Sequence, residues 1–186
     1  MNSKKIAIFA SGSGSNAENI YNYFKQHPEI SVERIVSNRK TAGVLERFKN
    51  TEVPVTIITK SDLENIDFIE SLNDIDLIIL AGFLVLIPSV FISHFEHKII
   101  NIHPSLLPKY GGEGMYGDHV HEAVLAHHES ESGITIHYVN EQYDKGEIIF
   151  QAKVEIVPED TIDTLKDKIH ALEHEFYPIV IENLLS

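Results

Sequence analysis

Hydrophobic positions along the chain follow two alternating patterns. Short apolar segments predict buried strands, expected at 5–9, 32–37, 55–58, 76–81 and 98–102. Alternating apolar and polar residues predict two further strands at 133–139 and 147–155. Apolar residues at i, i+3, i+4 and i+7 predict helices, expected from residue 15 onward, at 42–50, 61–73, 89–94 and 120–128, and in a long C-terminal segment. Ser15-x-x-Glu18 and Ser61-x-x-Glu64 fit capping boxes at two of these helix starts. The C-terminal segment carries one apolar stripe, made of Ile162, Leu165, Ile169, Leu172, Phe176 and Ile179.

Strands that alternate with helices predict an α/β fold. We expect a mostly parallel central sheet with helices on both faces and a long C-terminal helix, the last two strands forming an antiparallel pair. No repeat or linker divides the sequence, so a single domain over residues 1–186 is expected. Ligands in such folds bind at the carboxyl ends of the strands. The loops of interest are therefore 10–16, 38–42, 81–88, 101–118 and 140–146.

Charge and composition narrow the possible partners. The formal net charge of −13 opposes general binding to nucleic acid or to an anionic membrane. Cysteine is absent from the sequence, which excludes disulfides and thiolate metal sites. The longest apolar run, at 75–88, is too short to span a bilayer, and the first residues lead directly into a strand. We expect a cytoplasmic protein with no nucleic-acid or membrane partner.

A glycine loop joins the first strand to the first helix. Its residues 12–17 read G-S-G-S-N-A, which fits the dinucleotide pattern G-x-G-x-x-G/A. Backbone N–H groups at a helix N-terminus favour a phosphate. A dinucleotide site needs an acidic residue about 20 residues further on, but Asn38 and Arg39 stand there. Asn16 adds an amide that suits a single phosphate, although Arg39 leaves an NADP site open.

The most informative stretch is "KIINIHPSLLPKYGG" at 98–112. Asn101 and His103 lie at i and i+2, so both side chains point to one side of the strand that Pro104 ends. The amide can stabilise an oxyanion and the imidazole can move a proton near neutral pH. Asp144, in a later loop, could reach His103 and raise the pKa of its imidazole. A turn cap and a structural histidine are the competing interpretation.

Eleven histidines suggest a metal site. His119 and His121 form H-x-H followed by Glu122, with His127 and His128 nearby. Zinc would need a third or fourth ligand in a set geometry. A solvated loop and helix face explains the same residues, so we expect no metal site.

Six segments together resemble one known family. "SGSGSN", "LAGFL", "NIHPSLLPKY", "GITIHYV", "DKGEIIFQAKV" and "EHEFYPIVI" occur in order over roughly residues 5–184. They resemble the folate-dependent formyltransferases, and the first and last resemble the branch that acts on glycinamide ribonucleotide. The resemblance implies a Rossmann-like formyltransferase fold. It also implies transfer of a formyl group from 10-formyltetrahydrofolate, a cosubstrate, to the amine of that ribonucleotide in purine biosynthesis, without a metal.

The resemblance also assigns site residues. Asn101, His103 and Asp144 match the family's catalytic trio. Asn101 and a protonated His103 would stabilise an oxyanion, and Asp144 would relay a proton through a water. The ribonucleotide would contact the phosphate loop, with Glu173 on its glycinamide side, which gives Gly12, Ser13, Gly14, Ser15, Asn16 and Glu173. The folate would occupy an apolar slot lined by Leu80, Phe83, Leu84, Val85, Leu86, Ile87, Ile99, Val139 and Asn140. The expected assembly is a monomer or a homodimer.

The sequence departs from the family's pattern at three places. Leu84-Val85 stands where members often carry Met-Arg, which removes a cation from the rim of the pocket. The loop at 110–118 is longer than usual. His170 stands where some members carry Lys, so it is either a pH-dependent contact to the phosphate or a solvated side chain.

Two other functions use some of the same residues. An NADP-dependent oxidoreductase or a nucleotide-binding regulatory module could be built on the glycine loop. Methionyl-tRNA formyltransferase shares the central motif, but it would need an additional basic domain to hold tRNA. A sequence of 186 residues with a formal net charge of −13 does not provide such a domain.

Overall fold

The computed structural model describes residues 3–186, in which seven strands form one sheet in the order β3-β2-β1-β4-β5-β6-β7. β1 to β5 run parallel, and β6 and β7 are antiparallel to their neighbours. The strands are β1 (Lys4–Phe9), β2 (Ile30–Ser37), β3 (Val55–Ile57), β4 (Leu77–Leu80), β5 (Ile99–His103), β6 (Glu131–Tyr138) and β7 (Ile148–Glu155). The expected mostly parallel sheet with a final antiparallel pair is confirmed.

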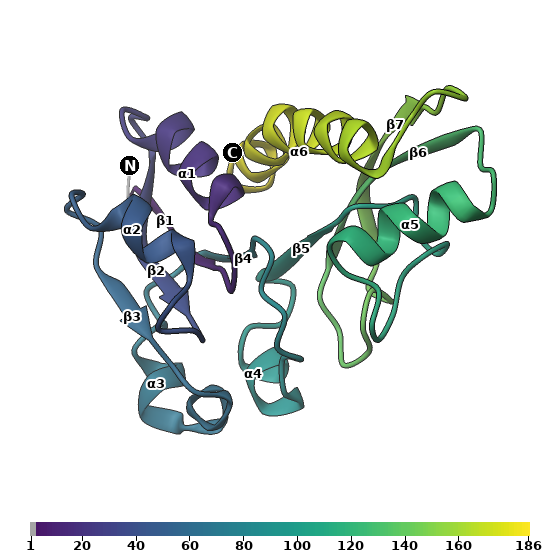
Figure 1. Cartoon of the computed structure of the whole chain (residues 1–186). Helices are drawn as coiled ribbons and strands as arrows, with labels where there is room; N and C mark the ends of the chain where they lie inside the picture. The colour runs from purple at the N-terminus through teal and green to yellow at the C-terminus, as the bar shows by residue number, and fades with distance from the viewer. Residues whose placement is uncertain (1–2) are drawn as a thin grey trace.

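Helices cover both faces of this sheet (Figure 1). They are α1 (Ser15–Phe24), α2 (Gly43–Phe48), the 3₁₀ helix η1 (Lys60–Glu64), α3 (Ile66–Glu70), α4 (Ser89–His94), α5 (Asp118–Ala126) and α6 (Ile162–Leu185). On β1, Ile6 and Ile8 pack with α1, α2 and α6, while Phe9 packs with α3 and α4 on the other face. Successive strand residues point to opposite faces, so a strand buried on both faces is apolar throughout. None of the helices within residues 3–186 is long and apolar enough to cross a membrane.

Local hydrogen bonding changes two predicted helix starts. The segment expected as one helix at 61–73 divides into η1 and α3, and the capping box is made by Thr59 and Asp62 rather than by Ser61 and Glu64. Asn65 caps α3 by accepting from the N–H of Asp67. The Thr59 hydroxyl caps this helix in place of the Ser61 hydroxyl, because the Asp62 carboxylate accepts from the Thr59 N–H, 2.6 Å away.

The predicted capping box at α1 is also wrong. The N-cap is Gly14, in a left-handed conformation with φ 78° and no side-chain cap. Glu18 instead pairs with Arg47 of α2, so its carboxylate is not used to cap the backbone. This leaves the N-terminus of α1 open toward the carboxyl end of the sheet.

The long C-terminal helix is present, but its buried face differs from the predicted stripe. Leu165 and Ile169 are buried as expected, whereas Ile179 is 39% exposed. Tyr177 is fully buried, and its hydroxyl donates to the backbone carbonyl of Leu80, 3.0 Å away. The buried face therefore also holds polar groups, and α6 is fixed to the carboxyl end of β4.

The strand order determines where loops gather. The chain runs outward from β1 through β2 to β3, and then returns to β4 on the other side of β1. The loops after β1 and β4 consequently leave in opposite directions and open a crevice between them. This point lies beside α6, whose Tyr177 bonds the end of β4, and beside the end of β5.

Candidate active site

A cavity of about 620 Å³ lies at this crevice. It collects residues from the loops after β1, β4 and β5, from the 139–144 loop and from α6. Every site residue predicted from the sequence lines it except Ile99. Ile99 is the first residue of β5 and is 2% exposed within the core, so its side chain packs below the level of the cavity. Ile99 therefore lies outside the cavity lining, and its expected folate contact stays a prediction.

The glycine loop presents unused donors to this cavity. Gly14 must be glycine, because a Cβ there would lie 2.6 Å from the Val44 Cβ in addition to the positive φ. The loop carbonyls face α2: Gly12 accepts from the N–H of Val44, and Ser13 accepts from the Arg47 guanidinium. Within residues 3–186 no acceptor bonds the backbone N–H groups of residues 12–17. These N–H groups, at the positive end of α1, form an anion-binding arrangement.

Asn16 and Glu173 lie beside the loop and face the same cavity. The Asn16 Nδ2 donates to Glu173 Oε2 over 2.9 Å, which connects α1 to α6. Burial raises the pKa of the Glu173 carboxyl, and the bond from Asn16 and the nearby His170 oppose that rise. The Asn16 Oδ1 is buried without a partner among the described residues. This end of the cavity therefore offers acceptors next to the N–H groups of the loop.

His103 is held in one tautomer. Its Nε2 donates to the backbone carbonyl of Tyr110 at 2.7 Å, so the Nδ1 of the neutral ring carries the lone pair. That Nδ1 lies 3.6 Å from Asp144 Oδ2, which confirms that residues 103 and 144 meet. Burial lowers the pKa of His103 more than Asp144 raises it, so the pKa lies below its ordinary value. Asp144 raises the pKa of His103 as expected, but burial outweighs it, and the net shift favours the neutral ring.

Asp144 is charged in spite of its partial burial. Burial raises the pKa of its carboxyl, but His137, His103 and the N–H of Gly112 together bring it below the ordinary value. The Gly112 N–H donates to Asp144 Oδ2 at 2.8 Å. This bond joins the 140–146 loop to the glycine-rich segment at 110–117.

His137 is a site residue that the sequence analysis missed. Its Nδ1 donates to the carbonyl of Tyr138, so the Nε2 of the neutral ring accepts from the Asn101 amide 3.1 Å away. The same Nε2 lies 3.6 Å from Asp144 Oδ1. His137 thus orients the Asn101 amide and leaves its second N–H for the cavity. Antiparallel pairing places His137 opposite Asn101, and that register could not be deduced from either strand alone.

Thr135 is a second missed residue, at the position opposite His103. Its hydroxyl donates to the Ser105 carbonyl and accepts from the Leu107 N–H and the Gln151 amide, at 2.7 to 3.0 Å. A hydroxyl has one donor and two acceptor positions, so this group is fully used. It fixes the turn that ends at the Tyr110 carbonyl, and through that carbonyl it fixes the His103 ring.

The other end of the cavity is apolar. Phe83, Ile87 and Leu80 are buried beneath it, and Leu84 and Leu86 stand at its exposed rim. The Ser11 hydroxyl holds this loop to the first strand by accepting from the Leu84 N–H at 3.0 Å. The slot therefore has the shape and chemistry for a flat, mostly apolar group next to Asn101.

Sequence and structure comparisons agree with this geometry. The family described as Formyl transferase matches residues 4–181. The chain belongs to the formyl transferase family. It is 38% identical to phosphoribosylglycinamide formyltransferase of Bacillus subtilis, covering 98% of this chain and 95% of that protein. The chloroplastic phosphoribosylglycinamide formyltransferase of Vigna unguiculata is 39% identical, over 97% of this chain but only 61% of that protein. The chain thus spans about three fifths of the curated plant relatives it matches.

Solved structures of formyl transferases share the fold. The crystal structure of phosphoribosylglycinamide formyltransferase from Bacillus halodurans is 39% identical, with a TM-score of 0.88, over 98% of this chain and 96% of that chain. Glycinamide ribonucleotide transformylase 1 from Geobacillus kaustophilus is 37% identical, with the same TM-score, over the whole of both chains. The expected Rossmann-like formyltransferase fold is confirmed.

The end of the second strand lacks the acidic residue of an NAD site. Asn38 stands where an NAD-binding protein has its ribose-binding acid, and the Asn38 side chain accepts from the Ser11 hydroxyl at 2.6 Å. The Asn38 side chain thus braces two loops.

The H-x-H segment does not form a shared metal-binding face. His119 is exposed and lies 3.5 Å from Glu122, whereas His121 is 3% exposed and lines the cavity. Among the described residues no group of three or more His, Asp or Glu side chains is arranged to hold a metal.

Proposed function

We propose that this formyl transferase moves a formyl group from 10-formyltetrahydrofolate to the amine of glycinamide ribonucleotide, a step in purine biosynthesis. One observation carries the proposal. A single cavity has unused phosphate-binding N–H groups at one end, an apolar slot at the other, and Asn101, His103 and Asp144 between them. The named activities of relatives that match the chain over almost their full length support the same reaction.

The ribonucleotide half of the cavity suits a phosphorylated sugar. The N–H groups of residues 12–17 would bind the phosphate, and the Asn16 and Glu173 oxygens would accept from the donors of the ribonucleotide. We expect Gly12, Ser13, Gly14 and Ser15 to contact the phosphate. The glycinamide contact of Glu173 remains a prediction.

The apolar half suits a folate. The volume of the whole cavity, about 620 Å³, falls in the range of about 300 to 1,000 Å³ typical of small-molecule sites. Eight of the nine predicted folate residues line it, namely Leu80, Phe83, Leu84, Val85, Leu86, Ile87, Val139 and Asn140. A pterin between these walls would place the formyl group beside the Asn101 amide.

The resting protonation states suggest how the protons move. Neutral His103 takes a proton from the attacking amine through its Nδ1, and the imidazolium so formed faces the Asp144 carboxylate. The free N–H of Asn101 and this imidazolium stabilise the oxyanion of the tetrahedral intermediate. When the bond from the formyl carbon to N10 breaks, the same proton passes to N10. A proton relay through water at Asp144 and a protonated resting His103 are not required.

The proposed reaction needs no metal and no covalent intermediate. A cytoplasmic location and a monomeric or homodimeric state remain predictions from the sequence.

The test follows formyl transfer directly. Purified protein is mixed with 10-formyltetrahydrofolate, with and without glycinamide ribonucleotide, and tetrahydrofolate is followed by absorbance while the formylated product is identified by mass. Release of tetrahydrofolate only when the ribonucleotide is present is expected. Binding of NADPH, detected by fluorescence, together with no formyl transfer would contradict the proposal and favour the oxidoreductase.

A further inference from the structure

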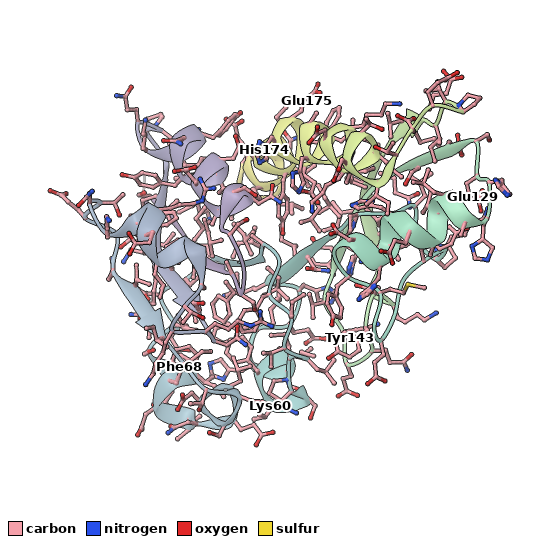
Figure 2. The ribbon with its side chains drawn as sticks, in the orientation of Figure 1. Lys60, Phe68, Glu129, Tyr143, His174 and Glu175 are labelled. Atoms are coloured by element: carbon pink, nitrogen blue, oxygen red, sulfur yellow. The ribbon has the colours of Figure 1, made fainter. Side chains whose placement is uncertain are left out.

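Two histidines lie one helical turn apart on the surface of α6. His170 and His174 are the only pair among the eleven histidines separated by four positions in the sequence. Their rings are parallel, with an angle of 3° between their planes and 6.3 Å between their centroids. Both side chains reach solvent, and Figure 2 labels His174 and the following Glu175 on α6, on the side of the molecule where α1 lies. Residues four apart on a helix share a face.

Charged side chains of α1, α2 and α6 surround the pair. Burial lowers the pKa of His174, and the neighbouring His170 and Arg47 lower it further. Arg47 itself is bound to Glu18 and to the Ser13 carbonyl. Glu173 Oε2 lies 3.9 Å from His170 Nε2. A metal ligand must be the neutral imidazole.

We propose that His170 and His174 chelate a single transition-metal dication of the class Zn²⁺, Ni²⁺ and Cu²⁺ on α6, at the edge of the cavity that His170 lines. Imidazole nitrogen prefers these ions to Mg²⁺ or Ca²⁺, which take oxygen ligands. Metal–nitrogen bonds are about 2.0–2.1 Å for zinc, so rotation of the two exposed rings must bring one nitrogen of each to a common point. Two neighbouring histidines at this spacing are the arrangement that helical zinc motifs use.

The helix provides two ligands, and water completes the coordination. No group of three His, Asp or Glu side chains in residues 3–186 is preorganised for a metal, so binding is weaker than at a structural zinc site. His174 does not line the cavity, although His170 does. The inference stands on the helix geometry alone and does not depend on the formyl transfer proposed above.

The chain offers a matched control for the pair. His119 lies 3.5 Å from Glu122 at i+3, as His170 lies 3.9 Å from Glu173 at i+3. Only His170 has a second histidine at i+4. His119→Ala therefore removes an exposed histidine next to a carboxylate without removing a helical pair.

Isothermal titration with Ni²⁺ on the full-length protein tests the inference. We expect one Ni²⁺ site whose affinity falls at least tenfold in His174→Ala and in His170→Gln and is unchanged in His119→Ala, with no binding of Mg²⁺. In a second measurement, substoichiometric Cu²⁺ should broaden the ring NMR signals of His170 and His174 before those of the other histidines. Equal Ni²⁺ affinity in His174→Ala and the unaltered protein, or first broadening elsewhere, would overturn the inference.

Discussion

At the scale of single residues, the proposed chemistry depends on how two side chains are oriented rather than on which residues are present. Sequence spacing made Asn101 and His103 candidates, and the family resemblance assigned them to a catalytic trio. Neither predicted the partners that set their hydrogen positions, namely the Tyr110 carbonyl and His137. Those partners come from a turn and from a neighbouring strand, and their pairing depends on tertiary register.

Removing either oriented group should affect turnover more than binding. Asn101→Ala deletes an oxyanion donor and His103→Ala deletes the base. Each is expected to lower kcat by about 10²- to 10³-fold, by analogy with oxyanion-hole variants. The apolar slot is unchanged, so the Kd for a folate analogue, measured by fluorescence, should stay within about twofold, which is less than 0.5 kcal/mol. Near-normal kcat in either variant would contradict the assigned roles.

The Thr135 hydroxyl provides a test of how the His103 ring is oriented. Thr135→Val leaves the Leu107 N–H and the Ser105 carbonyl without a buried partner, which costs about 1–3 kcal/mol for each group. Thr135→Ser keeps the hydroxyl and loses one methyl group. We expect a lower kcat in Thr135→Val with little change in KM, and its recovery in Thr135→Ser.

Chemical denaturation and the ¹⁵N shifts of His103 measure the two effects of Thr135 separately. A structural role alone would lower stability without altering the His103 tautomer. If Thr135→Val keeps the Nε2–H tautomer and full kcat, the link from Thr135 through Tyr110 to His103 is wrong.

At the scale of elements, local patterns predicted which segments are helices and strands better than they predicted where helices begin. Both expected capping boxes failed because another group was a better partner. Arg47 pairs with Glu18 across two helices, and Thr59 with Asp62 precedes Ser61. A four-residue pattern contains no information about a cation 29 positions away. The missing cap at α1 leaves the N–H groups of the glycine loop available to a ligand.

The junction of the glycine loop and α2 makes a prediction about stability. At Gly14 the φ is 78° and an added Cβ would lie 2.6 Å from Val44, whereas at Gly12 nothing lies within 4 Å of an added Cβ. Gly14→Ala is expected to destabilise the protein by about 1–3 kcal/mol through backbone strain. Gly12→Ala should change stability by less than about 0.5 kcal/mol. Urea denaturation of both variants makes the comparison, and equal midpoints would show that α2 does not constrain the loop.

At the scale of the whole molecule, the order of the strands assembles the site, which no single motif can do. It brings together residues as far apart as Gly12 and Glu173 by reversing the direction of the chain between β1 and β4. The alternating pattern of the sequence predicts this class of topology and the edge of the sheet where ligands bind. It does not predict that three histidines from three elements, His103, His121 and His174, become harder to protonate on folding.

These histidines make stability depend on pH in a definite direction. Burial lowers the pKa of His121 in the folded state, with Asp118 opposing the shift and Lys166, His170 and His103 adding to it. Below the unfolded pKa of about 6.5 the unfolded chain binds the proton more readily. The contribution of His121 is therefore fully present above that pH and is lost as the pH falls toward the folded pKa. Glu173 acts in the opposite direction, because the pKa of its carboxyl is raised.

A variant with an uncharged side chain at position 121 isolates the contribution of His121 to the pH dependence of stability. In His121→Gln the melting temperature between pH 7 and pH 5 should fall less steeply than in the unaltered protein, because Glu173 and the other groups remain in both. The change in slope, rather than the absolute melting temperature, is the relevant quantity, since glutamine also alters packing in the cavity wall. Identical slopes would mean that His121 takes up its proton equally well in the folded and unfolded chains, and the effect of its burial on the pKa would then be absent.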